Sequence, residues 1–363
     1  MRLARYRSGR DGAEWVGLVT DQLVTPLADG AGCAGQDRLL AVAMGRPSVP
    51  AAIGDPEPID RVRLLSPVPE PPSIRDFYAF EAHVATARRS RGLEMEPDWY
   101  ELPVFYFTNP AAVLGPDDEV AVPRGTVELD YELEVAAVIG VDCADVVPAD
   151  WLEVVAGFTV MNDWSARDLQ RREMALGLGP AKGKDFATSL GPVLVTPEEL
   201  LDEHGVPRAT MVTHVNGEEW SRGELAELHF GWGALLAHAS RSTRLRRGDV
   251  IGSGTVGTGC ILELGLVHGR ARYPYLVAGD VVTLGIEGIG SLTNRVGHRD
   301  RGQTGPMSDT SDRPETPPTE LREEVEEELE ELADEAASEE RDRMAERDAK
   351  GVDEPNDEVN QSS

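Results

Sequence analysis

Residues 128–140 read ELDYELEVAAVIG, and this stretch decides what kind of fold the chain can adopt. Its second half is filled with Val, Ile and Ala, which is typical of a buried β-strand. Side chains alternate between the two faces of a strand, so Glu132 and Glu134 would stand side by side on one face. Neighbouring carboxylates repel each other unless water screens them or a cation lies between them. The stretch therefore predicts either an exposed acidic strand or a cation site.

The alternation extends back to Glu128 and Asp130, at the start of the same strand. We interpret these two residues as its solvated end. If the strand does hold a cation, we expect the ion at the end that carries Glu132 and Glu134.

Two further acidic residues adjoin apolar, strand-like runs. Asp76 lies in SIRDFYAFEAHVATARR (residues 73–89), and Asp163 follows the run GFTVMN and precedes a helical pattern. Taken alone, Asp163 reads as a helix N-cap, and it shares a helical spacing with Arg167 and Gln170. Together with the glutamate pair, however, the two aspartates make a set of four hard oxygen ligands. Such a set suits Mg²⁺, Mn²⁺ or Ca²⁺ rather than Zn²⁺.

A glycine-rich stretch, GDVIGSGTVGTGCILELG, occupies residues 248–265. Within it, Gly252 to Gly257 fits the pattern GxGxxG, which binds dinucleotides only between a strand and a helix of a βαβ unit. The following TGCILELGLV is short and strand-like, so we do not favour a dinucleotide site. We expect a tight turn that exposes backbone N–H groups beside Thr255.

Composition excludes several classes of protein. The chain has 363 residues, of which 40% are hydrophobic, and a net charge of −30, which disfavours binding to nucleic acid or to an anionic membrane. Its apolar runs are too short to cross a bilayer, and the N-terminus shows no signal peptide pattern. The three cysteines, Cys33, Cys143 and Cys260, form no CxxC motif. We therefore expect no disulfide framework, no zinc site and a cytoplasmic location.

Three regions differ in their patterns. Residues 1–70 form short strand-like runs, so we predict a small N-terminal β unit that ends at the Pro-rich SPVPEPPS. Residues 71–300 are mainly β with some α: MVTHVNGEEW has the Asn-Gly signature of a hairpin. Helical patterns there are few, at about 84–96, 164–176 and 231–240.

The third region, residues 301–363, is an acidic tail. From residue 303 onward its net charge is −16, which favours a disordered, solvated segment. A thin apolar stripe beginning at Leu321 would instead suit a helix that docks on an unknown partner or on a second copy of the chain.

Taken together, these motifs resemble the fumarylacetoacetate hydrolase family. The resemblance covers about residues 63–292 and is carried by RDFYAFEAH, LDYELEVAAVIG, VMNDWSARDLQ, GKDFATSLGPVLVT, VNGEEW and GDVIGSGTVGTG. It implies a mixed β-roll catalytic domain that forms a homodimer. It also implies a divalent metal, Mg²⁺ or alternatively Mn²⁺ or Ca²⁺, and a small carboxylic acid as substrate.

The resemblance also implies roles for individual residues. The metal ligands would be Asp76, Glu132, Glu134 and Asp163. The catalytic groups would be His83 as water-activating base, Glu263 as its carboxylate partner, and Lys184 near the metal. The substrate-binding residues would be Tyr78, Arg167, Gln170 and Thr255. The lid arginine of the family falls on Gly92, and the adjacent Arg91 would take its place in a mobile lid over 84–98.

The implied reaction is hydrolysis of a C–C bond in a β-diketo or 2-oxo acid of the fumarylacetoacetate or acylpyruvate type. The expected setting is the catabolism of aromatic compounds or amino acids. The same scaffold also serves decarboxylases, isomerases and hydratases of 2-oxo or 2-hydroxydienoate acids. A non-enzymatic alternative is a metal-binding scaffold whose tail recruits a basic partner.

Overall fold

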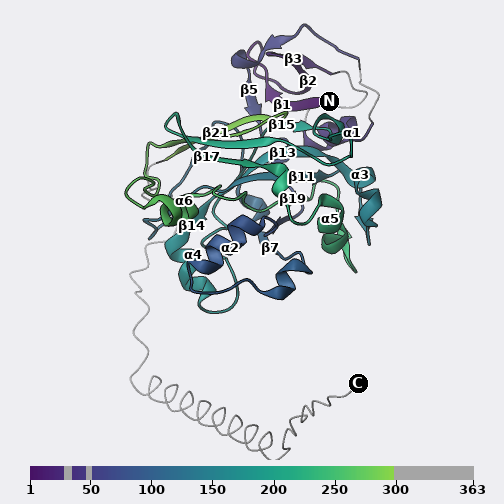
Figure 1. The fold of residues 1–363 in the computed structure, drawn as a ribbon. Helices are drawn as coiled ribbons and strands as arrows, with labels where there is room; N and C mark the ends of the chain where they lie inside the picture. The colour runs from purple at the N-terminus through teal and green to yellow at the C-terminus, as the bar shows by residue number, and fades with distance from the viewer. Residues whose placement is uncertain (28–34, 46–50, 298–363) are drawn as a thin grey trace, which may run out of the picture. The chain divides into compact units, whose positions relative to one another are not determined.

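A twelve-stranded, mixed sheet forms the centre of the fold, in the computed structural model that describes residues 1–27, 35–45 and 51–297 (Figure 1). Ten of its strands follow one path: β4 (Glu57–Pro58), β3 (Leu23–Pro26), β2 (Glu14–Thr20), β1 (Arg2–Arg7), β15 (Thr188–Val195), β13 (Val155–Asp163), β11 (Leu133–Ile139), β19 (Val250–Gly252), β6 (Ile74–Phe77) and β7 (Phe105–Thr108). Two more strands lie beside this path: β5 (Arg63–Leu65) on β1 and β8 (Val113–Leu114) on β15.

A second sheet has five strands in the order β17 (Glu218–Glu224), β16 (Thr210–Val215), β20 (Val281–Ile286), β21 (Gly290–Val296) and β9 (Glu119–Val120). The loop between β16 and β17 is Asn216-Gly217, and both residues have positive φ, 52° and 83°. Positive φ at both central positions is what a type I′ turn requires. The predicted Asn-Gly hairpin is confirmed.

Short elements complete the described residues. Two small ladders join β10 (Leu129–Asp130) to β14 (Ser165–Ala166) and β12 (Cys143–Ala144) to β18 (Arg244–Leu245). The six α-helices in the described ranges are α1 (Gln36–Met44), α2 (Glu81–Arg89), α3 (Trp151–Val154), α4 (Arg167–Met174), α5 (Trp232–Ser240) and α6 (Ile261–His268). Figure 1 shows α2 and α4 near β7, away from β1, β2 and β3. The expectation of a mainly β fold with some helices is confirmed.

The central strand β11 is buried along its whole length because both of its faces meet apolar cores. Val135 and Ala137 belong to the main core, whereas Ala136 and Val138 belong to a second core that includes α1. Because both faces of β11 are buried, the run VAAVI has no polar residue at alternate positions. Glu134 shares the face of Ala136, two residues nearer the start of the strand.

The first seventy residues contribute strands to the same large sheet. β1 pairs antiparallel with β15, with Leu3 opposite Leu194. The division of the chain at residue 70 stays a prediction. The tail 301–363 lies outside the described residues, and so does the prediction of its disorder or docking.

Several local predictions are wrong. TGCILELGLV is not a strand, because its residues from Ile261 form α6. Asp130 is not solvated: it is fully buried and accepts hydrogen bonds from the backbone N–H groups of Ile261 (2.7 Å) and Leu262 (3.0 Å). A carboxylate at a helix N-terminus stabilises the first turn. Asp130, which is distant in the sequence, therefore stabilises the N-terminus of α6. Glu128, the other residue of the predicted solvated end, is only partly exposed and pairs with Arg171 at 2.5 Å.

Asp163 is also not a helix cap. It is the last residue of β13, and the chain then forms β14 before α4 begins at Arg167 with Ala166 in the capping position.

The glycine-rich turn does run from a strand, β19, into a helix, α6. However, the strand after α6 is β20, which belongs to the other sheet, so no βαβ unit forms there. Among the described residues, no helix has the length and apolar character needed to cross a bilayer.

Candidate active site

Four buried carboxylates meet at one point of the large sheet. Asp76 comes from β6, Glu134 from β11 and Asp163 from the end of β13, and Glu132 lies just before β11. One oxygen of each carboxylate lies within 4.8 Å of the other three. Strand pairing explains the convergence, because β19 joins β11 to β6 and places Gly252 opposite Asp76. The sheet thus brings together the four residues predicted as metal ligands.

The carboxylate cluster (Asp76, Glu132, Glu134 and Asp163) leaves several oxygens without a protein partner. Oδ1 of Asp76, Oε2 of Glu134 and Oδ1 of Asp163 are buried and accept no hydrogen bond. Buried polar atoms normally have a partner, so three orphaned oxygens in one cluster fit a bound cation. Gly252 preserves this space, since a Cβ there would come within 2.4 Å of Asp76 Oδ1.

Electrostatics lead to the same conclusion. Burial, followed by the neighbouring Asp163, raises the pKa of Asp76 well above its ordinary value. Burial, followed by Asp76, raises the pKa of Glu134 in the same way. Each carboxyl resists ionisation because it is buried and, in second place, because its neighbours are acidic. A divalent cation would relieve that repulsion, and the hard oxygen donors suit Mg²⁺ or Mn²⁺.

Two basic side chains lie against this cluster. Nζ of Lys184 donates to Glu132 and, at 2.5 Å, to Oδ2 of Asp163. Nη2 of Arg167 donates to Oε1 of Glu132 at 2.7 Å, and its Nε donates to Asp130 at 2.8 Å. Although burial acts in the opposite direction, Lys184 and Arg167 lower the pKa of Glu132 below its usual range. The two basic side chains therefore favour the ionised form of Glu132.

A histidine–glutamate dyad adjoins the carboxylates. Nδ1 of His83, in α2, lies 2.8 Å from Oε2 of Glu263, in α6. The two residues are only 5% and 1% exposed. The ring of Tyr78 meets the His83 ring edge-on with 5.3 Å between centroids. A buried carboxylate at Nδ1 orients the ring and leaves Nε2 available as a base.

The residues predicted to bind substrate lie around these groups. Oγ1 of Thr255 donates to Glu134 at 3.3 Å, and Gln170 accepts from Nη1 of Arg167 at 3.0 Å. Burial raises the pKa of Tyr78 to about 12, and Arg91 acts in the opposite direction. The guanidinium of Arg91 thus acts electrostatically on Tyr78, while Arg91 itself is exposed.

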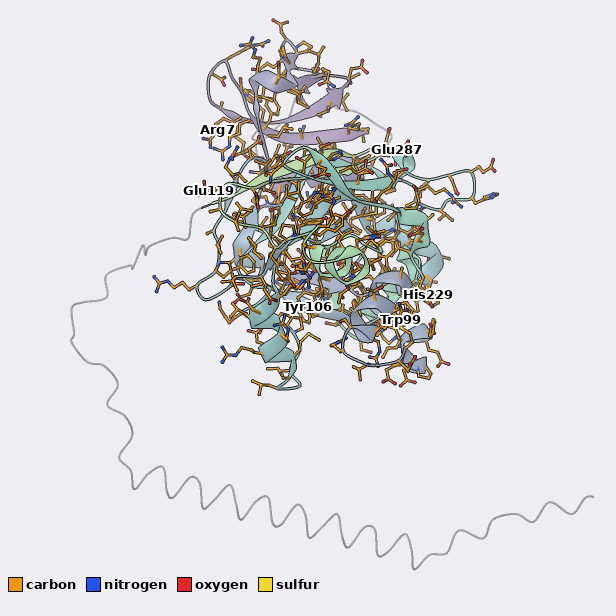
Figure 2. The ribbon with its side chains drawn as sticks, turned by 60° about the vertical axis from the view of Figure 1, so that its left-hand side comes forward. Arg7, Trp99, Tyr106, Glu119, His229 and Glu287 are labelled. Carbon is orange, nitrogen blue, oxygen red and sulfur yellow. The ribbon has the colours of Figure 1, made fainter. Side chains whose placement is uncertain are left out.

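Directly after the segment predicted as a lid, Trp99 contacts Tyr78 and His229. Nε1 of Trp99 donates to the carbonyl oxygen of Tyr78 at 2.9 Å, and its ring lies 5.0 Å from that of His229 (Figure 2). Within the segment, Nη2 of Arg88 pairs with Glu96 at 2.7 Å. Movement of this segment stays a prediction.

The sequence interpretation missed Tyr106, which Figure 2 labels in the lower part of the structure. Its hydroxyl donates to Oδ2 of Asp163, and Lys184 Nζ lies 5.7 Å from its ring centroid. Tyr106 is directly opposite Asp76 in the pairing of β6 with β7. Nothing in the local sequence FYFT reveals this pairing, so only the register could have identified the residue.

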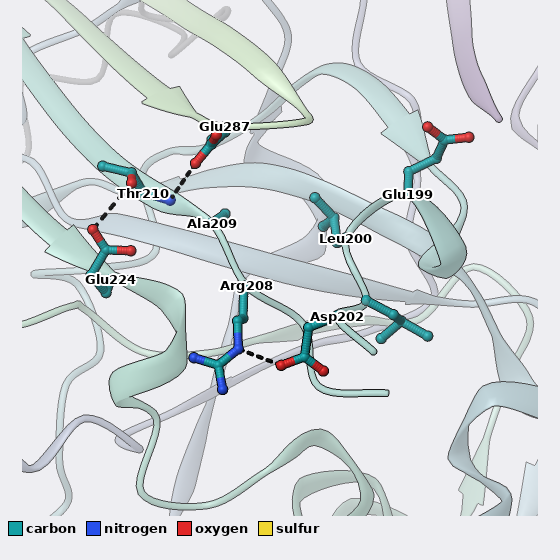
Figure 3. Close-up of a pocket in the computed structure, with 9 residues that line it drawn as sticks. Glu199, Leu200, Asp202, Arg208, Ala209, Thr210, Glu224 and Glu287 are labelled. Atoms are coloured by element: carbon teal, nitrogen blue, oxygen red, sulfur yellow. Dashed lines mark hydrogen bonds and ion pairs between the residues drawn. The ribbon is translucent and has the colours of Figure 1, made fainter. Parts of the chain in front are cut away.

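A separate cavity of about 360 Å³ lies elsewhere and is also acidic (Figure 3). Its lining includes Asp202, Arg208, Thr210, Glu224 and Glu287, and it includes none of the predicted site residues. Its carboxylates have partners: Asp202 accepts from Arg208, Glu224 from the Thr210 hydroxyl, and Glu287 from the Thr210 N–H.

The part of the chain that carries this site is similar to known proteins. Residues 73–297 match the fumarylacetoacetate (FAA) hydrolase C-terminal family. An oxaloacetate tautomerase of Bacillus subtilis, YisK, is 31% identical over 66% of this chain and 74% of its own length. A fumarylacetoacetate hydrolase structure from Exiguobacterium antarcticum has a TM-score of 0.66 and 29% identity, covering 82% of this chain and all of that one.

A further relative, from Burkholderia multivorans, is provisionally named a hydrolase. It is 36% identical over 52% of this chain, and the chain spans 63% of that protein's length.

Proposed function

The chain belongs to the fumarylacetoacetate hydrolase family, and we propose that it hydrolyses a C–C bond in a β-diketo or 2-oxo acid. The observation that carries this proposal is the buried dyad of His83 and Glu263, at 2.8 Å, beside the carboxylate cluster. A dyad of this kind can activate water, which a hydrolase needs. Family members that only rearrange a substrate do not consume water.

His83, held by Glu263, removes a proton from water. The water oxygen bonds to the carbonyl carbon of the substrate, and the adjacent C–C bond breaks. The electron pair of that bond leaves as an enolate, which is then protonated on carbon. The products are two acids, or an acid and a ketone.

The residues that would hold a divalent ion are Asp76, Glu132, Glu134 and Asp163. When bound, Mg²⁺ or Mn²⁺ would supply Lewis acidity that polarises the substrate carbonyl and stabilises enolate charge. Their orphaned oxygens support this assignment. We propose Mg²⁺ or Mn²⁺ as the bound metal.

Lys184 places a positive charge at the edge of the cluster, where negative charge develops during bond cleavage. Arg167 acts mainly by holding Glu132 and Gln170, because its three nitrogens already donate to protein acceptors. The exposed Arg91 is better placed to pair with a carboxylate of an arriving substrate. Tyr78 would shape the space beside the dyad, and Thr255 the space beside Glu134.

A second candidate is isomerisation or tautomerisation of a 2-oxo acid. The Bacillus subtilis relative named oxaloacetate tautomerase favours it. That reaction also uses an enolate, but it moves a proton without adding water. It would retain a need for the metal and lose the need for an activated water.

Assaying fumarylacetoacetate, acylpyruvates and oxaloacetate with Mg²⁺ and with Mn²⁺ tests the proposal. Hydrolysis gives two acids, or an acid and a ketone, and releases no CO₂. Decarboxylation releases CO₂. Tautomerisation changes the ultraviolet spectrum without changing the mass. We expect two-product cleavage of at least one β-diketo acid. Tautomerisation of oxaloacetate, with no cleavage of any β-diketo acid, would replace the hydrolase proposal with the second candidate.

We further propose a homodimer in the cytoplasm that acts in the catabolism of aromatic compounds or amino acids. Sedimentation of the full chain tests the dimer. A single monomeric species at working concentrations would contradict it.

A further inference from the structure

The dyad has a third neighbour that the proposed reaction does not use. Sγ of Cys260 lies 3.5 Å from Oε2 of Glu263, the same oxygen that lies 2.8 Å from Nδ1 of His83. We propose that His83, Cys260 and Glu263 form a second metal site, selective for Zn²⁺ and similar thiophilic cations. A cation bound at Nδ1 of His83 would keep the ring proton on Nε2, so the ring could not accept a proton from water and the enzyme would be inhibited. The inhibition rests on the proposed function, whereas the binding does not.

Geometry supports a site of this size. One donor atom from each residue lies within 4.8 Å of the other two, and all three residues are more than nine-tenths buried. Ligand atoms around tetrahedral Zn²⁺ are about 3.3–3.6 Å apart, given zinc bond lengths of about 2.0–2.3 Å. The sulfur–oxygen separation of 3.5 Å already fits, and the nitrogen–oxygen pair at 2.8 Å has to widen.

A second observation points to a missing ligand. Oε1 of Glu263 is buried and has no hydrogen-bond partner. A carboxylate that is 1% exposed with one unsatisfied oxygen carries a desolvation cost, which coordination to a cation would remove.

The donor types separate this site from the carboxylate cluster. Imidazole and thiolate ligands suit Zn²⁺, whereas Mg²⁺ prefers oxygen. Binding replaces the S–H bond of Cys260 with a metal–sulfur bond and releases that proton to solvent. The ring proton of His83 moves from Nδ1 to Nε2, so no oxidant or reductant is needed. The cysteine spacing in the sequence predicts no zinc site. The fold creates one by placing α6 against α2.

Cobalt provides a direct probe, because a thiolate bound to Co²⁺ absorbs by charge transfer and an oxygen ligand does not. The chain has three cysteines, so the double variant Cys33→Ser/Cys143→Ser keeps Cys260 as its only thiol. With Mg²⁺ saturating the carboxylate cluster, we expect Co²⁺ to produce this absorption at one equivalent. Zn²⁺ should abolish it by displacement. Absence of the absorption in the folded double variant would overturn the proposal.

The triple variant that adds Cys260→Ser should lose the absorption, and retention would show that sulfur is not a ligand. If the triple variant does not fold, Glu263→Gln in the double variant serves instead and should weaken Co²⁺ binding about 10- to 100-fold, as losses around metal sites do. Unchanged Co²⁺ affinity in Glu263→Gln would contradict the site.

Inhibition is measured separately, as a fraction of each variant's own activity at saturating Mg²⁺. Zn²⁺ should inhibit the double variant at concentrations at least about 10-fold below those needed for the triple variant. Equal sensitivity would overturn the inhibitory role. The two proposals fail independently: a cobalt–thiolate band without any hydrolysis refutes only the reaction, and hydrolysis without the band refutes only the zinc site.

Discussion

Two acidic groups of this molecule have similar composition and opposite surroundings. The carboxylate cluster is buried and leaves three oxygens without partners. The acidic cavity of Figure 3 places Asp202, Glu224 and Glu287 at the surface, and each accepts a hydrogen bond from a nearby donor. Clustered negative charge is therefore common to both and identifies neither. Burial without partners is what distinguishes a cation site from a solvated acidic surface.

The largest expected effect comes from removing charge in each group. Glu132→Gln with Glu134→Gln should reduce activity by more than about 100-fold, since even supporting partners of metal ligands cost 10- to 100-fold. The rise in melting temperature that Mg²⁺ produces should also disappear. Glu224→Gln with Glu287→Gln is the matched control and should leave both properties unchanged. Equal losses in the two double variants would erase the distinction.

Histidines near the two groups provide the next test. His83→Ala should reduce hydrolysis by about 10²- to 10⁴-fold, the usual contribution of a general base. The Mg²⁺-induced shift in melting temperature should remain, because His83 is not in the carboxylate cluster. His204→Ala, at an exposed position beside Asp202, should retain full activity. Normal hydrolysis by His83→Ala would exclude the water-activating role.

Tyr106→Phe should have an intermediate effect. Losing the hydroxyl that donates to Asp163 should weaken Mg²⁺ affinity about 10-fold, at the lower end of losses of supporting partners. Isothermal titration with Mg²⁺ measures this change. Tyr100→Phe, which removes an exposed hydroxyl paired with Glu81 at 2.7 Å, is the control. Identical affinities in the two variants would show that Tyr106 does not position Asp163.

The smallest effect should come from Asp202→Asn in the acidic cavity. The hydrogen bond from Arg208, followed by that from the N–H of Val206, lowers the pKa of Asp202 to about 2. A lowered folded-state pKa adds stability above the ordinary value, and this stability is lost as pH falls toward the folded-state pKa. The small difference in melting temperature between wild type and variant should thus shrink below about pH 4. A difference that grows at low pH would contradict the assignment.

Much of the site could be predicted because its ligands lie in strands with strong local patterns. The alternation in ELDYELEVAAVIG placed Glu132 and Glu134 on one face, and the resemblance supplied their two aspartate partners. What failed depended on contacts between distant segments. Asp130 looked solvated because its partner, the start of α6, lies far along the chain. Tyr106 escaped notice because only strand register brings it to the site. Cys260 lies three residues before Glu263 and was passed over because the cysteines form no CxxC motif.

The pairing of β19 with both β6 and β11 has a consequence for how the protein folds. Asp76 reaches Glu134 only after β19, which follows both in the sequence, has inserted between their strands. Contacts of such long sequence separation form slowly. A nascent or partly folded chain therefore has no complete cation site, and a bound ion would act on the finished sheet. It should slow unfolding while leaving the rate of folding nearly unchanged.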